Sequence, residues 1–133
     1  MRNIFWSMTL VVACLFGAAT AQAQKQVTTN NAIVPGEVWN DTDGNPINAH
    51  GGGILYHEGT YYWYGEYKKG KTILPEWATW ECYRTDVTGV SCYSSKDLLN
   101  WKFEGIVLPA VKDDQGHDLH TSKVLERPKV IYN

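Results

Sequence analysis

Residues 47–67 read Ile47-Asn-Ala-His-Gly-Gly-Gly-Ile-Leu-Tyr-His-Glu-Gly-Thr-Tyr-Tyr-Trp-Tyr-Gly-Glu-Tyr67. After three consecutive glycines, the run has the pattern of a β-hairpin. We expect a short apolar strand at 54–57, a tight turn at Glu58-Gly59, and an aromatic return strand at 61–67. Aromatic side chains favour strands because flat rings pack well on a pleated surface. The glycine of the turn can take the positive φ that a two-residue hairpin loop needs.

The three glycines, 51–53, remove three side chains in succession. A backbone without side chains can be approached closely. The sequence leaves open whether another segment of the chain or a ligand makes that approach.

The N-terminal residues 1–23 have the features of a secretory signal peptide. Arg2 gives the positive start, residues 4–19 are mostly apolar, and Ala21-Gln22-Ala23 is a small-residue cleavage site. The apolar run is shorter than the ~20 residues of a membrane-spanning helix. We expect a secreted or periplasmic protein; the alternative is a lipoprotein signal, with the chain lipid-anchored through Cys14.

Composition excludes some classes of partner. The chain has a net charge of −2 and no basic run, which argues against nucleic acid. Cys82 and Cys92 can pair in an oxidising compartment or remain as two buried thiols, and the sequence does not decide between them. No His/Cys spacing suggests zinc, and the oligomeric state is not predicted.

The rest of the chain shows no sustained helical period, so we expect an all-β fold. Residues 24–35 are interpreted as a mobile leader. Further strands are expected at 87–94 and 101–108, joined by a polar turn in which Asp97 and Asn100 bond to the backbone. Another strand is expected to begin at 130–132.

Four strands in sequence, joined by hairpin-like links, are typical of one blade of a β-propeller. A weak internal repeat supports this: with His50 placed over Glu126, an offset of 76 residues, 54–56 falls on 130–132. A propeller needs at least ~4 blades, so we expect a fragment of a longer protein. The alternative is a small β-sandwich domain that assembles with partners.

Four motifs are distinctive in combination: the run from Trp39 to Gly53, the strand 62–66, the turn 94–101 and Leu125-Glu-Arg-Pro-Lys129. Together they resemble glycoside hydrolase family 43, specifically its exo-β-1,3-galactanase branch. The resemblance implies a five-bladed β-propeller, of which residues 36–133 hold the first blade and the start of the second. It also implies exo-hydrolysis of β-1,3-galactan, with another family 43 specificity (arabinofuranosidase or xylosidase) or a non-catalytic carbohydrate-binding propeller as alternatives.

Glycosidases use two carboxyl groups, which stand ~6.5–9.5 Å apart in inverting enzymes. The family is inverting by resemblance, and the position of Glu126 in it orients the general acid and tunes the pKa of that acid. The alternative for Glu126 is a surface ion pair with Arg127. The family's general acid lies beyond Asn133, so we expect the fragment itself to be inactive.

The expected substrate-binding residues are His50, Gly51, Gly52, Glu66 and Arg127. Glu66 shares one strand face with two tyrosines and lies near the strand end, where it can bond to sugar hydroxyls or stay exposed. His50 can bind a sugar hydroxyl or an axial water, or be a structural histidine. Many family members have a catalytic-base Asp in this region; here Asn48-Ala49-His50 stands instead, which leaves the water-activating group unassigned.

Trp77 and Trp80 lie in the long connection 68–86, where they can stack on sugars or, the interpretation we favour, cap the hydrophobic edge of the blade. No cofactor is expected. Calcium occurs on the axis of some relatives, but the sequence shows no ligand set for it. The expected partner is an oligo- or polysaccharide.

Overall fold

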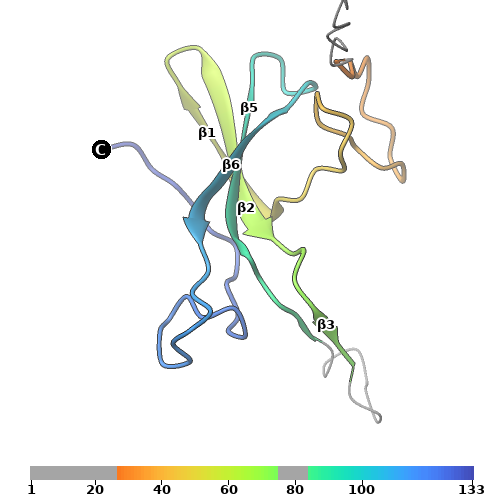
Figure 1. The fold of residues 1–133 in the computed structure, drawn as a ribbon. Helices are drawn as coiled ribbons and strands as arrows, with labels where there is room; N and C mark the ends of the chain where they lie inside the picture. Colours follow the sequence, from red (N-terminus) through yellow and green to blue (C-terminus); the bar gives the residue numbers. More distant parts are fainter. Residues whose placement is uncertain (1–26, 75–83) are drawn as a thin grey trace, which may run out of the picture.

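Four antiparallel strands form the main sheet of the computed structural model, which describes residues 27–74 and 84–133 (Figure 1). They are β1 (His50–His57), β2 (Thr60–Tyr67), β5 (Gly89–Ser95) and β6 (Lys102–Pro109), in the order β1-β2-β5-β6. Two short strands, β3 (Thr72–Ile73) and β4 (Arg84–Thr85), pair as an extension beyond β2 and β5. The expected all-β class is confirmed for the described residues, which contain no helix.

The predicted hairpin is present as β1 and β2. Glu58 and Gly59 have φ values of 46° and 73°, so both loop residues are left-handed, as a type I′ turn requires. β1 begins four residues before the expected start because it includes the glycines. A bulge between His50 and Gly53 accommodates them, with Gly51 at a φ of 56°.

The strands expected at 87–94 and 101–108 are β5 and β6, each displaced by one or two residues. Asp97 shapes the turn between them as expected, since its Oδ1 accepts the amides of Leu99 and Asn100 at 2.9 and 2.8 Å. The Asn100 side chain donates to Asp97 Oδ2 at 2.8 Å. The turn between β5 and β6 is thus fixed largely by hydrogen bonds from backbone amides to the Asp97 side chain.

The hydrophobic core lies on the sheet face that carries Trp63. Trp101 and Tyr93 are 1% and 2% exposed, and the Trp63 ring meets the Trp101 ring edge-on at 5.3 Å. The segment 39–49 covers this face, with Ala49 packed so closely on Gly65 that a Cβ there would lie 2.3 Å from the Ala49 carbonyl carbon. Trp101 is therefore a core residue.

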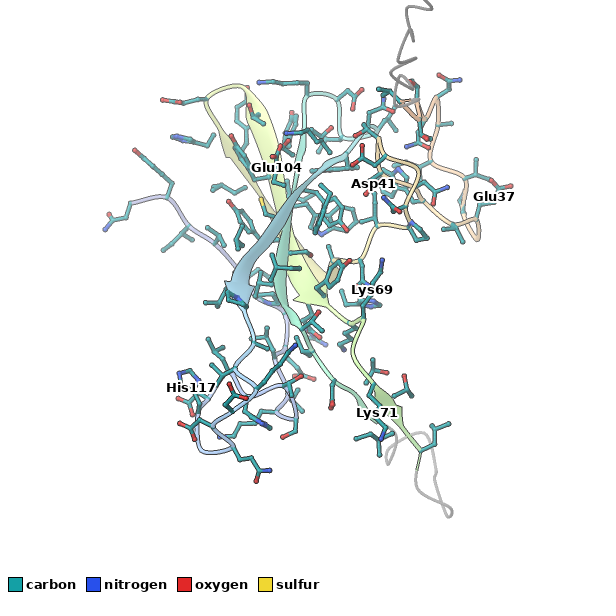
Figure 2. The ribbon with its side chains drawn as sticks, in the orientation of Figure 1. Glu37, Asp41, Lys69, Lys71, Glu104 and His117 are labelled. Atoms are coloured by element: carbon teal, nitrogen blue, oxygen red, sulfur yellow. The ribbon has the colours of Figure 1, made fainter. Side chains whose placement is uncertain are left out.

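A tight turn within this covering segment contains Asp41, which Figure 2 labels near the β5–β6 turn. The Asp41 carboxylate is buried and accepts the amides of Asp43 and Asn45, both at 2.9 Å. The amide of Thr42 in turn donates to the carbonyl of Trp101. These bonds fix the turn against the strand that carries the core tryptophan.

The prediction of a strand at 130–132 is wrong, because these residues belong to no strand of the structure. Ile131 and Tyr132 are 85% and 72% exposed. An apolar, β-branched composition favours a strand, but a strand also needs a backbone ladder to a partner. This segment is instead held by side chains, as described below.

The segment 24–35, expected to be a mobile leader, is described from residue 27 on, and two of its backbone amides form hydrogen bonds to the rest of the chain. The Thr28 amide donates to Thr42, and the Asn30 amide donates to Asn100 Oδ1 at 2.6 Å. The signal peptide, Cys14, Trp77, Trp80 and Cys82 lie outside the described residues. Within the described part, no helix is long and apolar enough to cross a membrane.

Candidate functional site

Glu66 lies at the end of β2, opposite His50 of β1. Its side chain is not exposed at a strand end but buried, with the residue 4% exposed. Its Oε1 accepts the backbone amide of Arg127 at 3.0 Å, across a sequence separation of 61 residues. The contact therefore joins two of the sequence motifs at one place.

The second oxygen of Glu66, Oε2, lies 2.8 Å from the ammonium of Lys68. At that distance the two groups form an ion pair. The oxygen nevertheless accepts no hydrogen bond of ordinary geometry from the described residues. Buried carboxylate oxygens nearly always accept one. Oε2 thus lacks a hydrogen bond of ordinary geometry within the described residues, while the Lys68 ammonium balances the charge of the carboxylate.

The segment 126–132 runs beside β1 in the same direction. A Cβ on Gly51 would lie 3.2 Å from Arg127 Cγ, and one on Gly53 would lie 2.7 Å from Lys129 Cδ. At the far end of β1, the rings of His57 and Tyr132 stack at 4.2 Å. The offset of the weak internal repeat therefore matches true neighbours near the start of β1.

The glycines serve chain packing in this structure, one of the two uses that the sequence left open. Gly51 and Gly53 admit the segment 126–132, whereas a Cβ on Gly52 would lie 2.3 Å from the carbonyl oxygen of Tyr64. Lys129 then donates to the carbonyl oxygens of Gly51 and Gly52 at 3.1 and 2.9 Å.

Glu126 and Arg127 are both exposed, and Arg127 has a positive φ of 49°. Such a φ is uncommon for a residue other than glycine. In the described part of the chain Glu126 forms no ion pair with Arg127, the alternative that its sequence position allowed. Its carboxylate is free beside the bonded Arg127 amide.

His50 is exposed and lines an open hollow of about 270 Å³ with Trp39, Trp63 and neighbouring apolar residues. Trp63 and Glu66 lie on opposite faces of β2, since an odd number of positions separates them. The structure thus brings Gly51, Glu66 and Arg127 together, while the His50 side chain lines a hollow on the other face.

Tyr64 and Cys92 share the sheet face of Glu66. Burial raises the pKa of the Tyr64 hydroxyl and the pKa of the Cys92 thiol, so both groups are neutral near pH 7. The charged group in direct contact with the Glu66 carboxylate is the Lys68 ammonium. No three His, Cys, Asp or Glu side chains gather into a metal site within residues 27–74 and 84–133.

Two lysines of this site were not among the residues predicted from sequence. Lys68 follows Glu66 by two positions, which is the spacing of same-face neighbours in a strand, and that spacing is the signal for it. Lys129 stands in the Glu-Arg-Pro-Lys motif, but its partners are backbone carbonyls 77 and 78 residues earlier, for which the sequence has no signal.

Solved structures similar to this chain are glycosidases. One is a family 43 β-1,3-galactosidase bound to galactodeoxynojirimycin, 52% identical over 76% of this chain and 26% of its own, with a TM-score of 0.59. Another is a variant of the exo-β-1,3-galactanase of Phanerochaete chrysosporium with β-1,3-galactotriose, 42% identical over 76% and 20%, with a TM-score of 0.59.

A third is the exo-β-1,3-galactanase of Clostridium thermocellum, 43% identical over 76% and 18%, with a TM-score of 0.54. No protein-family model and no curated protein matched. These structural matches place the chain among glycoside hydrolase sequences. The chain belongs to family 43, as its motifs indicated, and it spans about a fifth to a quarter of the length of these solved relatives.

Proposed function

We propose that the whole protein is an exo-acting glycosidase that releases galactose from β-1,3-galactan. The solved relatives carry the names of that activity, and one of them holds β-1,3-galactotriose. The observation that carries the proposal is the bond between Glu66 and the Arg127 amide, which joins two family motifs beside Gly51.

The proposed chemistry is inverting hydrolysis. The bond between the anomeric carbon and the glycosidic oxygen breaks while water attacks that carbon from the opposite face. A general acid gives a proton to the departing oxygen, and a base takes one from the water. Glu126 is assigned to orient the acid and to raise the pKa of that acid by its own negative charge. The acid and the base themselves are assigned to no residue of this chain.

The sugar contacts are assigned to His50, Gly51, Gly52, Glu66 and Arg127. Oε2 of Glu66 accepts no hydrogen bond of ordinary geometry from the described residues, and it becomes an acceptor for a sugar hydroxyl when Lys68, whose ammonium lies 2.8 Å away, moves aside. The exposed guanidinium of Arg127 offers several N–H donors. Gly51 and Gly52 are assigned by their place at the start of β1, where Gly51 lies directly beside Arg127 and Glu66.

We further propose that the sheet is the first blade of a five-bladed β-propeller in a secreted or periplasmic protein. The neighbouring strands are connected in sequence order, β1-β2-β5-β6, as in a propeller blade. The parallel course of 126–132 beside β1 fits the start of a second blade. Residues 1–23 are the proposed signal peptide.

The test is an assay of the whole protein on β-1,3-galactan, with proton NMR of the first product. Free galactose that appears as the α-anomer supports an inverting exo-galactanase. Glu126→Gln should lower kcat about 10²-fold, at the low end for acid–base groups. Release of arabinose or xylose instead would overturn the substrate. Binding of galactan without any product would overturn the assignment as an enzyme.

A further inference from the structure

The buried carboxylate of Glu66 has a structural partner that the substrate-binding assignment does not use. Its Oε1 accepts the amide of Arg127, the residue that directly follows Glu126. A hydrogen bond from an amide to a carboxylate is stronger than one to a neutral acceptor. The backbone on one side of Glu126 is therefore held to the end of β2.

The conformation of Arg127 needs such a partner. A residue with a positive φ and a side chain is stable only when its surroundings fix it. Here Glu66 fixes the Arg127 amide, and Gly51 leaves the space that Arg127 occupies. A Cβ on Gly51 would lie only 3.2 Å from Arg127 Cγ and 3.4 Å from Arg127 Cα. The turn that presents Glu126 thus depends on one carboxylate and one glycine.

Lys68 links the same carboxylate to the core. Its ammonium lies 2.8 Å from Oε2, and its amide donates to Asn48 Oδ1 at 2.9 Å. Asn48 is itself held, since its amide donates to the buried Tyr93 hydroxyl at 3.0 Å. The carboxylate therefore has a balanced charge and a backbone anchored beside the core.

We propose that Glu66 is a positioning residue that acts through Glu126: by holding the Arg127 amide, it sets where the Glu126 carboxylate stands. This inference rests on the proposed function, which gives Glu126 its role. It differs from the sugar contact, which uses the other oxygen of Glu66.

The direct test is the Arg127 amide resonance in the ¹⁵N-labelled chain. If Glu66 holds this amide, the exchange of the Arg127 amide proton with solvent is slow. Exchange as fast as that of an exposed amide without a hydrogen bond would overturn the proposal. This measurement needs no variant, so misfolding cannot obscure it.

Glu66→Gln extends the test. Glutamine has one acceptor oxygen and one NH₂ group, so the Arg127 amide either faces a donor or keeps only a neutral acceptor, which holds it more weakly than a carboxylate does. Arg127 amide exchange should become about tenfold faster, the loss expected for one hydrogen bond. Glu104→Gln is the matched control, since Glu104 lies on β6, the far edge of the sheet, and bonds to Ser94 and Lys102 instead (Figure 2). Unchanged Arg127 exchange in Glu66→Gln would overturn the proposal.

Kinetics of the whole protein separate the two proposals. At saturating galactan, Glu66→Gln should lower kcat, yet the double variant with Glu126→Gln should be no slower than Glu126→Gln alone, because Glu66 acts through Glu126. Additive losses would overturn the positioning role and leave the galactanase standing. The other outcome is that Glu66→Gln speeds Arg127 amide exchange but the whole protein hydrolyses no galactan. That result would overturn the proposed function and, with it, the role of Glu126.

Discussion

The ammonium of Lys129 donates a 2.9 Å hydrogen bond to the carbonyl oxygen of Gly52, 77 residues earlier in the chain. It also bonds to Gly51, so a single lysine covers the start of β1 at the edge of the sheet. Exposed strand edges invite pairing with other chains, and lysine is one of the residues that discourage it. The segment 126–132 thereby protects the edge without forming a strand of its own.

Alanine at two adjacent glycines should have unequal effects. A Cβ on Gly52 would lie 2.3 Å from the backbone oxygen of Tyr64, which cannot move away cheaply, whereas a Cβ on Gly53 meets only the flexible Lys129 side chain. Gly52→Ala should therefore lower the free energy of unfolding by about 1–3 kcal/mol, as overpacking does. Gly53→Ala is the matched control with a smaller loss. Urea unfolding of both variants decides, and equal losses would contradict the structure.

The hairpin was predictable because its signals are local: an apolar strand, a Glu58-Gly59 turn and an aromatic strand follow one another directly. The turn bonds of Asp97 are local in the same sense. The burial of Glu66 was not predictable, since it depends on a backbone amide 61 residues away. The strand expected at 130–132 failed because composition alone does not supply a ladder partner.

The sequence predicted which residues belong to the candidate site better than it predicted how they are arranged. Gly51, Glu66 and Arg127 do meet, but His50 lines a hollow on the other face of the sheet. A bulge between His50 and Gly53 lies at this point, and no sequence pattern predicted it. A bulge re-aims side chains in its strand. One extra residue in a strand is therefore enough to change which predicted residues share a site.

Lys129→Met should loosen the far end of the segment 126–132. The two hydrogen bonds to glycine carbonyls are lost, so Tyr132 should spend less time stacked on His57, where the ring centroids now lie 4.2 Å apart. The ring-current shift of the His57 imidazole protons measures this stacking by NMR. Lys112→Met, at another exposed lysine, is the control and should leave the shift as it is. A His57 shift that survives Lys129→Met would show that the lysine does not hold the segment.

Tyr93→Phe should destabilise the chain by about 1 kcal/mol, the net value of one hydrogen bond. The Tyr93 hydroxyl is buried and accepts the amide of Asn48 at 3.0 Å, so phenylalanine leaves that amide without its partner. Tyr56→Phe is the control, because Tyr56 is 61% exposed. Urea unfolding with equal midpoints for the two variants would refute the role of this bond.

Asp97 should make the stability of the chain sensitive to acid. The Asn100 side chain, and then the amides of Asn100 and Leu99, hold the pKa of the Asp97 carboxyl well below its usual range. A carboxyl group whose pKa is lower in the folded state stabilises that state above its unfolded pKa of about 3.9. This contribution is lost progressively as the pH falls below that value toward the folded pKa. Asp97→Asn should be less stable than the wild type at pH 7, and the gap should narrow on acidification. Urea unfolding of both chains between neutral pH and pH 2 measures the gap, and a constant difference would show that the bonds to Asp97 do not depend on its charge.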